Sequence, residues 1–308
     1  MTTGAVLVTG AGGWLGSALV GRLADVHRGP VVGFDRAALD CADVDRVEAV
    51  LTDVRPRTVV HLAASLARGP ERGVAEAQWR DTFMAGRTVV QAAAAAGVPH
   101  VVLLGTMEEL GDHSGVLTPD LPARPRTTYG LCKSLVREVA HFEARGAEGL
   151  RVEWARPTTV YGPGQRGAML VPSACAAARA GQVAPFTSGE QRRDFLYVDD
   201  LVAWMTLAVD ERVSVHGERG FHLHHLGTGE GVPVRDVLRH IADEFPGARF
   251  DLGALPRRPH EPLVQVAAPY ASADPVLGSW WPGTPWQDGL KRTIEWWRSQ
   301  PQALASSP

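Results

Sequence analysis

The sequence predicts an α/β fold, a doubly wound parallel sheet with a smaller lobe towards the C-terminus. Three observations predict it. Short apolar segments alternate with helical patterns, a glycine-rich turn joins the first apolar segment to the first helix, and the pattern loosens into shorter elements after Tyr161. Apolar strands that alternate with helices form a parallel sheet covered on both faces.

The first predicted unit is a strand over residues 5–8, a turn, and a helix over residues 17–26. Gly10, Gly13 and Gly16 of the turn follow the spacing G-x-x-G-x-x-G. Glycines there let the turn close, let the backbone approach a pyrophosphate, and let the helix pack on the strand, while the helix N-terminus stabilises negative charge. The unit is therefore predicted to bind a dinucleotide, as in a Rossmann fold.

A second strand over residues 30–34 ends at Asp35, which predicts the cofactor. Its carboxylate would accept hydrogen bonds from ribose hydroxyls and repel a 2'-phosphate. The adjacent Arg36 would instead attract such a phosphate. The predicted cofactor is NAD(H) or NADP(H), with NAD(H) slightly favoured.

The remaining elements continue the alternation. They are a helix at 44–51, a strand at 58–62, an alanine-rich helix around 77–96, a strand at 100–104, the helix of Tyr129, a strand at 152–155, and a C-terminal helix around 286–297. The predicted Rossmann domain comprises residues 1–160 plus about 196–228. The predicted substrate-binding lobe comprises about 161–195 plus 229–300, and residues 301–308 form a flexible tail.

Composition points to a small-molecule partner. The net charge of -3 does not provide the excess of positive charge that binds nucleic acid or an anionic membrane. The chain has no apolar run of about 18 residues and no leader pattern at its start, so we expect a cytoplasmic protein. The three cysteines are far apart, which argues against a disulfide framework or a zinc cluster. No metal site is predicted. His222 and His224 would share one face of a strand and are expected to pack there or to face solvent.

Tyr129 and Lys133 are the strongest candidates for catalysis. They lie four residues apart, so they share one face of the predicted helix. Lys133 is one of only two lysines among 31 Lys and Arg residues, which suggests that a guanidinium would not serve there. An ammonium near a phenol lowers a pKa that starts near ~10 and makes the tyrosine a usable proton donor and acceptor.

With these residues in place, the chain resembles the extended short-chain dehydrogenases/reductases of the sugar-nucleotide epimerase, dehydratase and reductase group. The resemblance covers nearly the whole length. The segments that carry it are residues 9–16, 61–64, 129–133, 155–157, 161–164, 193–195, 198–200, 226–229 and 257–262.

The resemblance implies a role for the turn after the strand at 100–104. Thr106, five residues before Gly111, would hydrogen-bond the substrate oxygen beside Tyr129. Glu108 falls where family dehydratases keep a glutamate that acts at the sugar C5. Met107 stands where they keep an aspartic acid, and a thioether cannot protonate a leaving hydroxyl. Dehydration is therefore disfavoured.

The resemblance also implies binding residues. The cofactor residues would be Gly10, Gly13, Trp14, Leu15, Gly16, Asp35, Arg36, Asp40, Leu62, Ala63, Ala64, Tyr129 and Lys133. Arg193 and Arg258 would bind the nucleotide diphosphate, since guanidinium forks suit phosphate geometry. Thr159 occupies the place of an asparagine that usually touches the diphosphate, and Thr82 that of a second family asparagine, so the substrate contacts are altered.

Several functions share this apparatus. We expect NAD(P)H-dependent reduction of a nucleotide-linked 4-keto-6-deoxy sugar to the 4-hydroxy sugar, because the connection after Asp35 is short, as in family reductases. The alternative is a nucleotide-sugar 4-epimerase with tightly bound NAD. A 4,6-dehydratase and a non-catalytic cofactor sensor are further alternatives, and the presence of Thr106, Tyr129 and Lys133 argues against the sensor. The resemblance further implies a homodimer formed through the helix at 77–96 and the helix of Tyr129.

Overall fold

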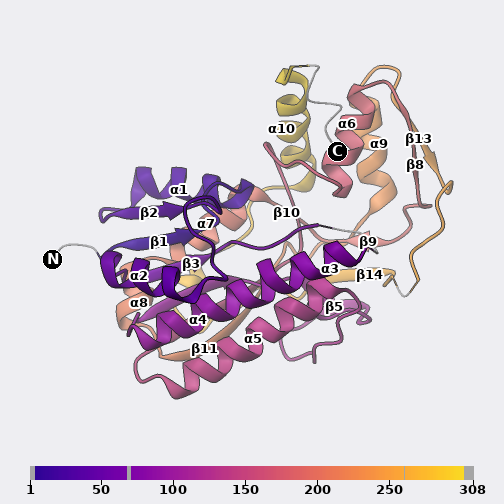
Figure 1. Cartoon of the computed structure of the whole chain (residues 1–308). Helices are drawn as coiled ribbons and strands as arrows, with labels where there is room; N and C mark the ends of the chain where they lie inside the picture. Colours follow the sequence, from indigo (N-terminus) through magenta and orange to yellow (C-terminus); the bar gives the residue numbers. More distant parts are fainter. Residues whose placement is uncertain (1–3, 68–70, 260, 302–308) are drawn as a thin grey trace.

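A six-stranded parallel sheet forms the centre of the computed structural model, which describes residues 4–67, 71–259 and 261–301 (Figure 1). In spatial order its strands are β2 (Val31–Phe34), β1 (Val6–Thr9), β3 (Thr58–His61), β4 (His100–Leu104), β6 (Arg151–Pro157) and β11 (Gly220–Leu226). The chain runs from β1 outward to β2 and then returns to the other side of β1 as β3. Loops that follow β1 and β3 therefore diverge at this point, where open α/β sheets bind their ligands.

Helices cover both faces of the sheet because successive strand residues point to opposite sides. Val6 and Val8 pack with α1 (Trp14–Val26) and α7 (Val198–Ala208), whereas Leu7 packs with α2 (Val44–Val54), α4 (Ala85–Ala95) and α5 (Thr128–Gly146). The predicted alternation and the α/β fold class are confirmed. The structure describes every residue from 35 to 43 and has no strand there, as the short connection predicts.

The alanine-rich helix differs from the prediction in one respect. It consists of α3 (Arg72–Gln78), a π-helical turn η1 (Trp79–Met84) and α4, which follow one another directly. Such π-turns add a residue per turn and occur frequently at functional sites. Within η1, the Thr82 hydroxyl accepts a hydrogen bond from the Ser65 amide at 3.1 Å, which ties the turn to the loop after β3.

A second group of elements lies beyond the carboxyl ends of β1 and β3 (Figure 1). It contains α6 (Leu170–Arg179), α9 (Val234–Glu244) and α10 (Trp286–Ser299), with β8 (Val183–Phe186) paired to β13 (Arg249–Leu252). The connecting elements are β5 (Gly115–Leu117), β7 (Thr159–Tyr161), β9 (Arg192–Arg193), β10 (Phe195–Tyr197), α8 (Glu211–His216), β12 (Val232–Pro233), β14 (Val264–Ala267) and short 3-10 turns at Met107–Glu109 and Leu277–Ser279.

The predicted domain boundaries stay a prediction. β5 lies within the range assigned to the first domain but pairs with β14, within the range assigned to the lobe. Residues 302–308 of the predicted tail lie outside the described residues. Over the described ranges, no helix is both long and apolar enough to cross a bilayer.

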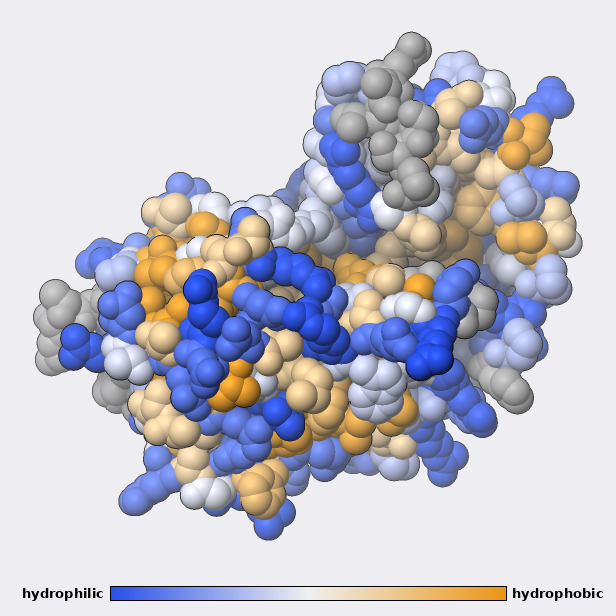
Figure 2. Space-filling model, viewed as in Figure 1, coloured by the Kyte–Doolittle hydropathy of each residue, from blue (hydrophilic) through white to orange (hydrophobic). Residues whose placement is uncertain are grey.

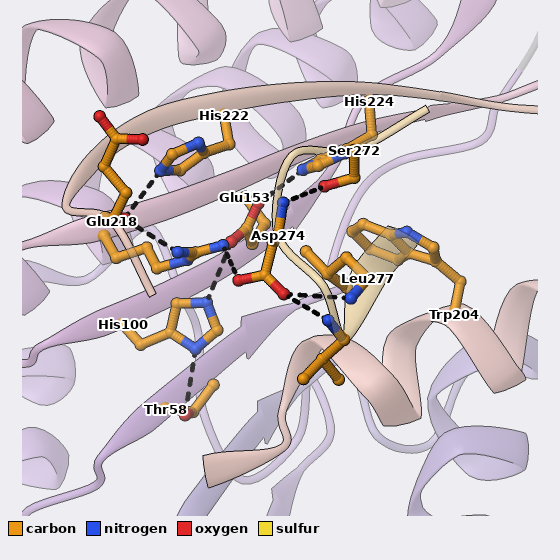
Figure 3. A network of polar contacts seen from close by, with 12 residues as sticks. Thr58, His100, Glu153, Trp204, Glu218, His222, His224, Ser272, Asp274 and Leu277 are labelled. Atoms are coloured by element: carbon orange, nitrogen blue, oxygen red, sulfur yellow. Dashed lines mark hydrogen bonds and ion pairs between the residues drawn. The ribbon is translucent and has the colours of Figure 1, made fainter. Parts of the chain in front are cut away.

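A buried polar network joins the segment around residue 274 to the sheet (Figure 3). Arg151 of β6 donates to Glu153 at 2.5 Å and to Asp274 at 3.0 Å. The other Glu153 oxygen lies 2.6 Å from His224 Nε2. Asp274 also accepts the backbone amides of residues 276 and 277. Because each charged group has partners, the network fixes the segment around residue 274 against β6 and β11.

Candidate active site

The loops after β1, β2 and β3 enclose a cavity of about 440 Å³. Its lining brings together eight predicted cofactor residues, namely Gly10, Gly13, Asp35, Arg36, Asp40, Leu62, Ala63 and Ala64. The lining also includes Asp81 of η1 and Ala85 of α4. Figure 2 shows the molecule hollowed between the part formed by the sheet and its helices and the part formed by α6, α9 and α10.

The glycines of the first turn fit a dinucleotide because their backbone leaves no room for side chains. Gly10 has a φ of +72°, and a Cβ there would lie 2.7 Å from the Ala63 nitrogen. A Cβ on Gly16 would lie 2.1 Å from the Gly10 oxygen. The turn thus forms an open cradle directly before the N-terminus of α1, where free backbone amides favour a phosphate.

Trp14, Leu15 and Gly16 have structural contacts at the start of α1. They are absent from the described lining of the cavity. The Trp14 indole donates to the Pro163 carbonyl at 2.7 Å, so it ties the start of α1 to the segment after β7. Leu15 packs against the core, and Gly16 allows the first turn to close. Their predicted cofactor contacts stay a prediction.

Tyr129 and Lys133 lie on α5, buried beside the end of β4. The Lys133 Nζ lies 5.9 Å from the centroid of the Tyr129 ring and donates to the Leu104 carbonyl at 2.7 Å. Thr106 follows two residues after Leu104. Gly130 allows this approach, because a Cβ there would lie 2.5 Å from the Glu108 oxygen. The structure therefore holds the tyrosine and lysine of α5 against the turn that carries Thr106.

Lys133 is charged at neutral pH, whereas the neighbouring His61 is not. Burial lowers the pKa of Lys133 to about 8, and the nearby Glu109 opposes that change. His61, at the end of β3, has its pKa lowered to about 3 by burial and secondarily by Lys133. His61 is therefore neutral and Lys133 is mostly protonated at pH 7, so Lys133 places a positive charge 5.9 Å from the centroid of the Tyr129 ring.

The 3-10 turn directs the side chains of the adjacent residues Met107 and Glu108 to different surroundings. The Glu108 carboxylate accepts a hydrogen bond from the Thr127 hydroxyl at 2.6 Å, and Thr127 caps α5. Met107 is buried with Leu110, Leu117 and Ala267 in a separate apolar cluster. Glu108 thus joins the turn to the start of α5, and Met107 belongs to the core. A catalytic role for Glu108 stays a prediction.

Glu109 is a residue of this site that sequence reasoning missed. Its fully buried carboxylate accepts from the Thr106 amide at 2.9 Å, the Trp154 indole at 3.2 Å and the Arg156 Nε at 2.9 Å. A Cβ on Gly105 would lie 2.3 Å from the same carboxylate. The spacing Thr106-x-x-Glu109 is that of a capping box, and this signal could have identified it.

The predicted substrate residues Arg193 and Thr159 belong to adjoining segments, and Arg258 is close enough to Arg193 to affect its charge. Arg193 donates to Glu261 at 2.8 Å, and burial lowers its pKa, with the positive charge of Arg258 acting in the same direction. The Thr159 amide donates to the Asp194 carbonyl at 3.0 Å, so Thr159 adjoins this segment. His260, in the segment that carries Arg258, lies outside the described residues. Binding of a diphosphate here stays a prediction.

Comparison with known proteins agrees with this geometry. Residues 6–221 match the model of the NAD dependent epimerase/dehydratase family. The chain belongs to this family. The predicted family, the Rossmann-type fold and the NAD(P)-dependent enzyme class are confirmed, and the prediction of NAD as cofactor is supported by the family and its NAD-bound structures.

Two UDP-glucose 4-epimerases match nearly the whole chain. The UDP-glucose 4-epimerase of Mycolicibacterium smegmatis is 31% identical over 96% of this chain and 99% of its own length. The UDP-glucose 4-epimerase of Azospirillum brasilense is 29% identical, over 98% of this chain and 94% of its own. The structure titled MoeE5 in complex with UDP-glucuronic acid and NAD is 29% identical, covers 96% of this chain and 99% of its own, and superposes with a TM-score of 0.80.

The neutral His61 predicts a loss of stability in acid. On unfolding, the pKa of His61 returns to its ordinary value of 6.5. Between about pH 6.5 and pH 3 this imidazole is therefore protonated in the unfolded chain but neutral in the folded protein. The free energy of unfolding should fall by about 1.4 kcal/mol per pH unit from this group as pH drops through that range. In His61→Gln, urea denaturation between pH 6.5 and 4.5 should show a slope shallower by that amount.

The exposed His141 provides the matched control. His141→Gln should leave the pH slope as in the wild type. Equal slopes in wild type and His61→Gln would contradict the assignment of a neutral His61.

Proposed function

We propose that the protein is an NAD-dependent nucleotide-sugar 4-epimerase acting on a UDP-hexose. The observation that carries this choice is the end-to-end match with UDP-glucose 4-epimerases, in a chain that keeps Thr106, Tyr129 and Lys133 at one site. The epimerase, the alternative that the sequence left open, is thereby better supported than the expected reductase.

The residues of the site suit proton transfer at the sugar C4 oxygen. The Tyr129 phenolate takes the proton of the 4-hydroxyl and returns it, while Lys133 stabilises the phenolate and Thr106 hydrogen-bonds the same oxygen. When bound, NAD supplies the acceptor and the donor of the hydride at C4. Arg193 and Arg258 hold the diphosphate, so that the sugar is anchored at one end and can turn at the other.

A 4-ketoreductase is the second candidate, because one observation favours it. The connection from β2 to α2 contains only residues 35–43, which matches the short layout that led sequence analysis to a reductase. A dehydratase has less support, since Met107 is packed in the core where a catalytic acid would be required.

The fate of the cofactor separates the two candidates. The protein purified without added nucleotide should retain NAD in near-stoichiometric amount and interconvert UDP-glucose and UDP-galactose with no net change in nicotinamide absorbance. An epimerase returns the hydride it removes, so no cofactor is consumed. A protein that purifies empty and oxidises one NADH or NADPH per nucleotide-linked 4-keto-6-deoxyhexose would instead be the reductase.

The acid-base role of Tyr129 has its own test. Tyr129→Phe should lower kcat at least ~100-fold, because general acid-base catalysis is lost, while the bound NAD content stays near that of the wild type. Tyr270→Phe is the control. The Tyr270 hydroxyl contacts Trp204 and the His224 of the buried network, so its removal should leave kcat near the wild-type value. A Tyr129→Phe variant with more than about a tenth of wild-type kcat would exclude the role.

We also propose a homodimer formed through α3, η1, α4 and α5. Ala85, Ala92 and Ala93 pack inward, but Trp79, Leu131 and Phe142 expose apolar side chains along these helices, Phe142 by 71%. Phe142→Asp should weaken the dimer by placing a charge in an apolar interface. Light scattering at micromolar concentration measures the mass, and a wild-type mass of one 33.0 kDa chain would contradict the proposal.

A further inference from the structure

Arg36 and Asp81 form an ion pair across the mouth of the cavity. The Arg36 Nη1 lies 2.5 Å from Asp81 Oδ2, and its Nη2 lies 3.0 Å from Asp81 Oδ1. Two parallel N–H···O bonds of this kind orient both groups. Arg36 follows β2 and Asp81 belongs to η1, so the pair joins two walls of the cavity that are 45 residues apart in sequence.

Asp81 is held in place on its other side. Arg80 donates to Asp81 at 2.9 Å and also pairs with Asp40. The pKa of Asp40 is lowered, chiefly by a hydrogen bond from the Ala42 amide and then by Arg80, so Asp40 is ionised at neutral pH. The Asp81 side chain is 14% exposed, whereas that of Arg36 is 70% exposed. The less exposed carboxylate therefore determines where the more exposed guanidinium lies.

This arrangement changes what the cavity offers to a 2'-phosphate. An arginine after β2 can accept that phosphate only if its fork is free. Here both terminal nitrogens of Arg36 already donate to Asp81. Asp35, Asp40 and Asp81 face the same cavity, so with Arg36 and Arg80 the cluster has one more negative than positive charge. A phosphate would meet a net negative field and no free fork on Arg36.

We propose that Asp81 is a specificity-determining residue that withdraws Arg36 from the 2'-phosphate position and so makes the cavity select NAD(H) over NADP(H). The inference rests on the proposed use of this cavity for a dinucleotide. It assigns the selection to a pair of residues, because Asp35 alone would leave Arg36 available to bind the phosphate.

A competition experiment tests it without any substrate. The full-length protein is incubated to exchange equilibrium with a large, equimolar excess of NAD⁺ and NADP⁺, so that any co-purified nucleotide is replaced, and is then desalted. The bound nucleotides are released and measured by chromatography. Wild type should carry mainly NAD⁺. Asp81→Asn keeps the size of the side chain but removes its charge and one of its two acceptor oxygens, which releases the Arg36 fork from its paired geometry. The bound NADP⁺/NAD⁺ ratio should therefore rise at least about tenfold, the effect of one charge-assisted pair.

Two further variants make the result specific. In Asp81→Asn with Arg36→Gln, the ratio should return towards that of wild type, because the gain depends on the freed guanidinium. Asp40→Asn is the matched control: it removes a carboxylate from the same cavity but leaves Arg36 paired, so its shift should be clearly smaller. Melting temperatures confirm that each variant is folded, and Asp81→Ala replaces Asp81→Asn if that variant is not.

Three results would overturn the proposal. The first is an unchanged NADP⁺/NAD⁺ ratio in folded Asp81→Asn. The second is an equal loss of both nucleotides, which would show that the Arg36–Asp81 pair only stabilises the cavity. The third is a raised ratio that persists in the double variant. Each would leave the proposed function intact. A wild type that binds neither nucleotide would overturn the proposed function as well.

Discussion

The close approach of the Gly10 turn to the backbone of Ala63 is the contact on which the site depends. It occurs where the strand order reverses, so the loops after β1 and β3 would otherwise separate. Because a side chain at Gly10 would displace the loop after β3, the absence of a Cβ there keeps the cavity open. The predicted cofactor residues on three loops share one cavity for this reason.

Two buried carboxylates arrange the rest of the molecule around that cavity. Glu109 holds the Thr106 amide, Trp154 and Arg156, and so fixes the turn that faces α5. Glu153, on the same strand as Trp154, pairs with Arg151 and His224 and anchors the C-terminal segment. Buried acids are tolerated only when their oxygens are fully hydrogen-bonded, which explains why both have basic partners. Glu109 thus fixes the position of the turn that carries Thr106. Glu153, through Arg151, holds the segment around residue 274 against the sheet.

Charge is distributed differently in the two parts of the site. Near Tyr129, burial keeps His61 neutral, whereas Lys133 stays mostly protonated at pH 7 although burial lowers its pKa to about 8. At the entrance of the cavity, Arg36 and Arg80 are compensated by acidic side chains. An arginine that sequence reasoning assigns to a phosphate can thus be engaged by a carboxylate from another element.

The sequence by itself determined the parallel sheet, the glycine turn, and the pairing of Tyr129 with Lys133. These features are encoded locally: strand residues alternate, glycine spacing sets a turn, and positions four apart share a helical face. Only the tertiary structure decided that Met107 packs inward, that Glu109 also accepts from Trp154 and Arg156, that Trp14 reaches Pro163, and that Asp81 holds Arg36. These depend on partners brought together by the fold, including pairs separated by 45 and 149 residues, and no local pattern specifies such contacts.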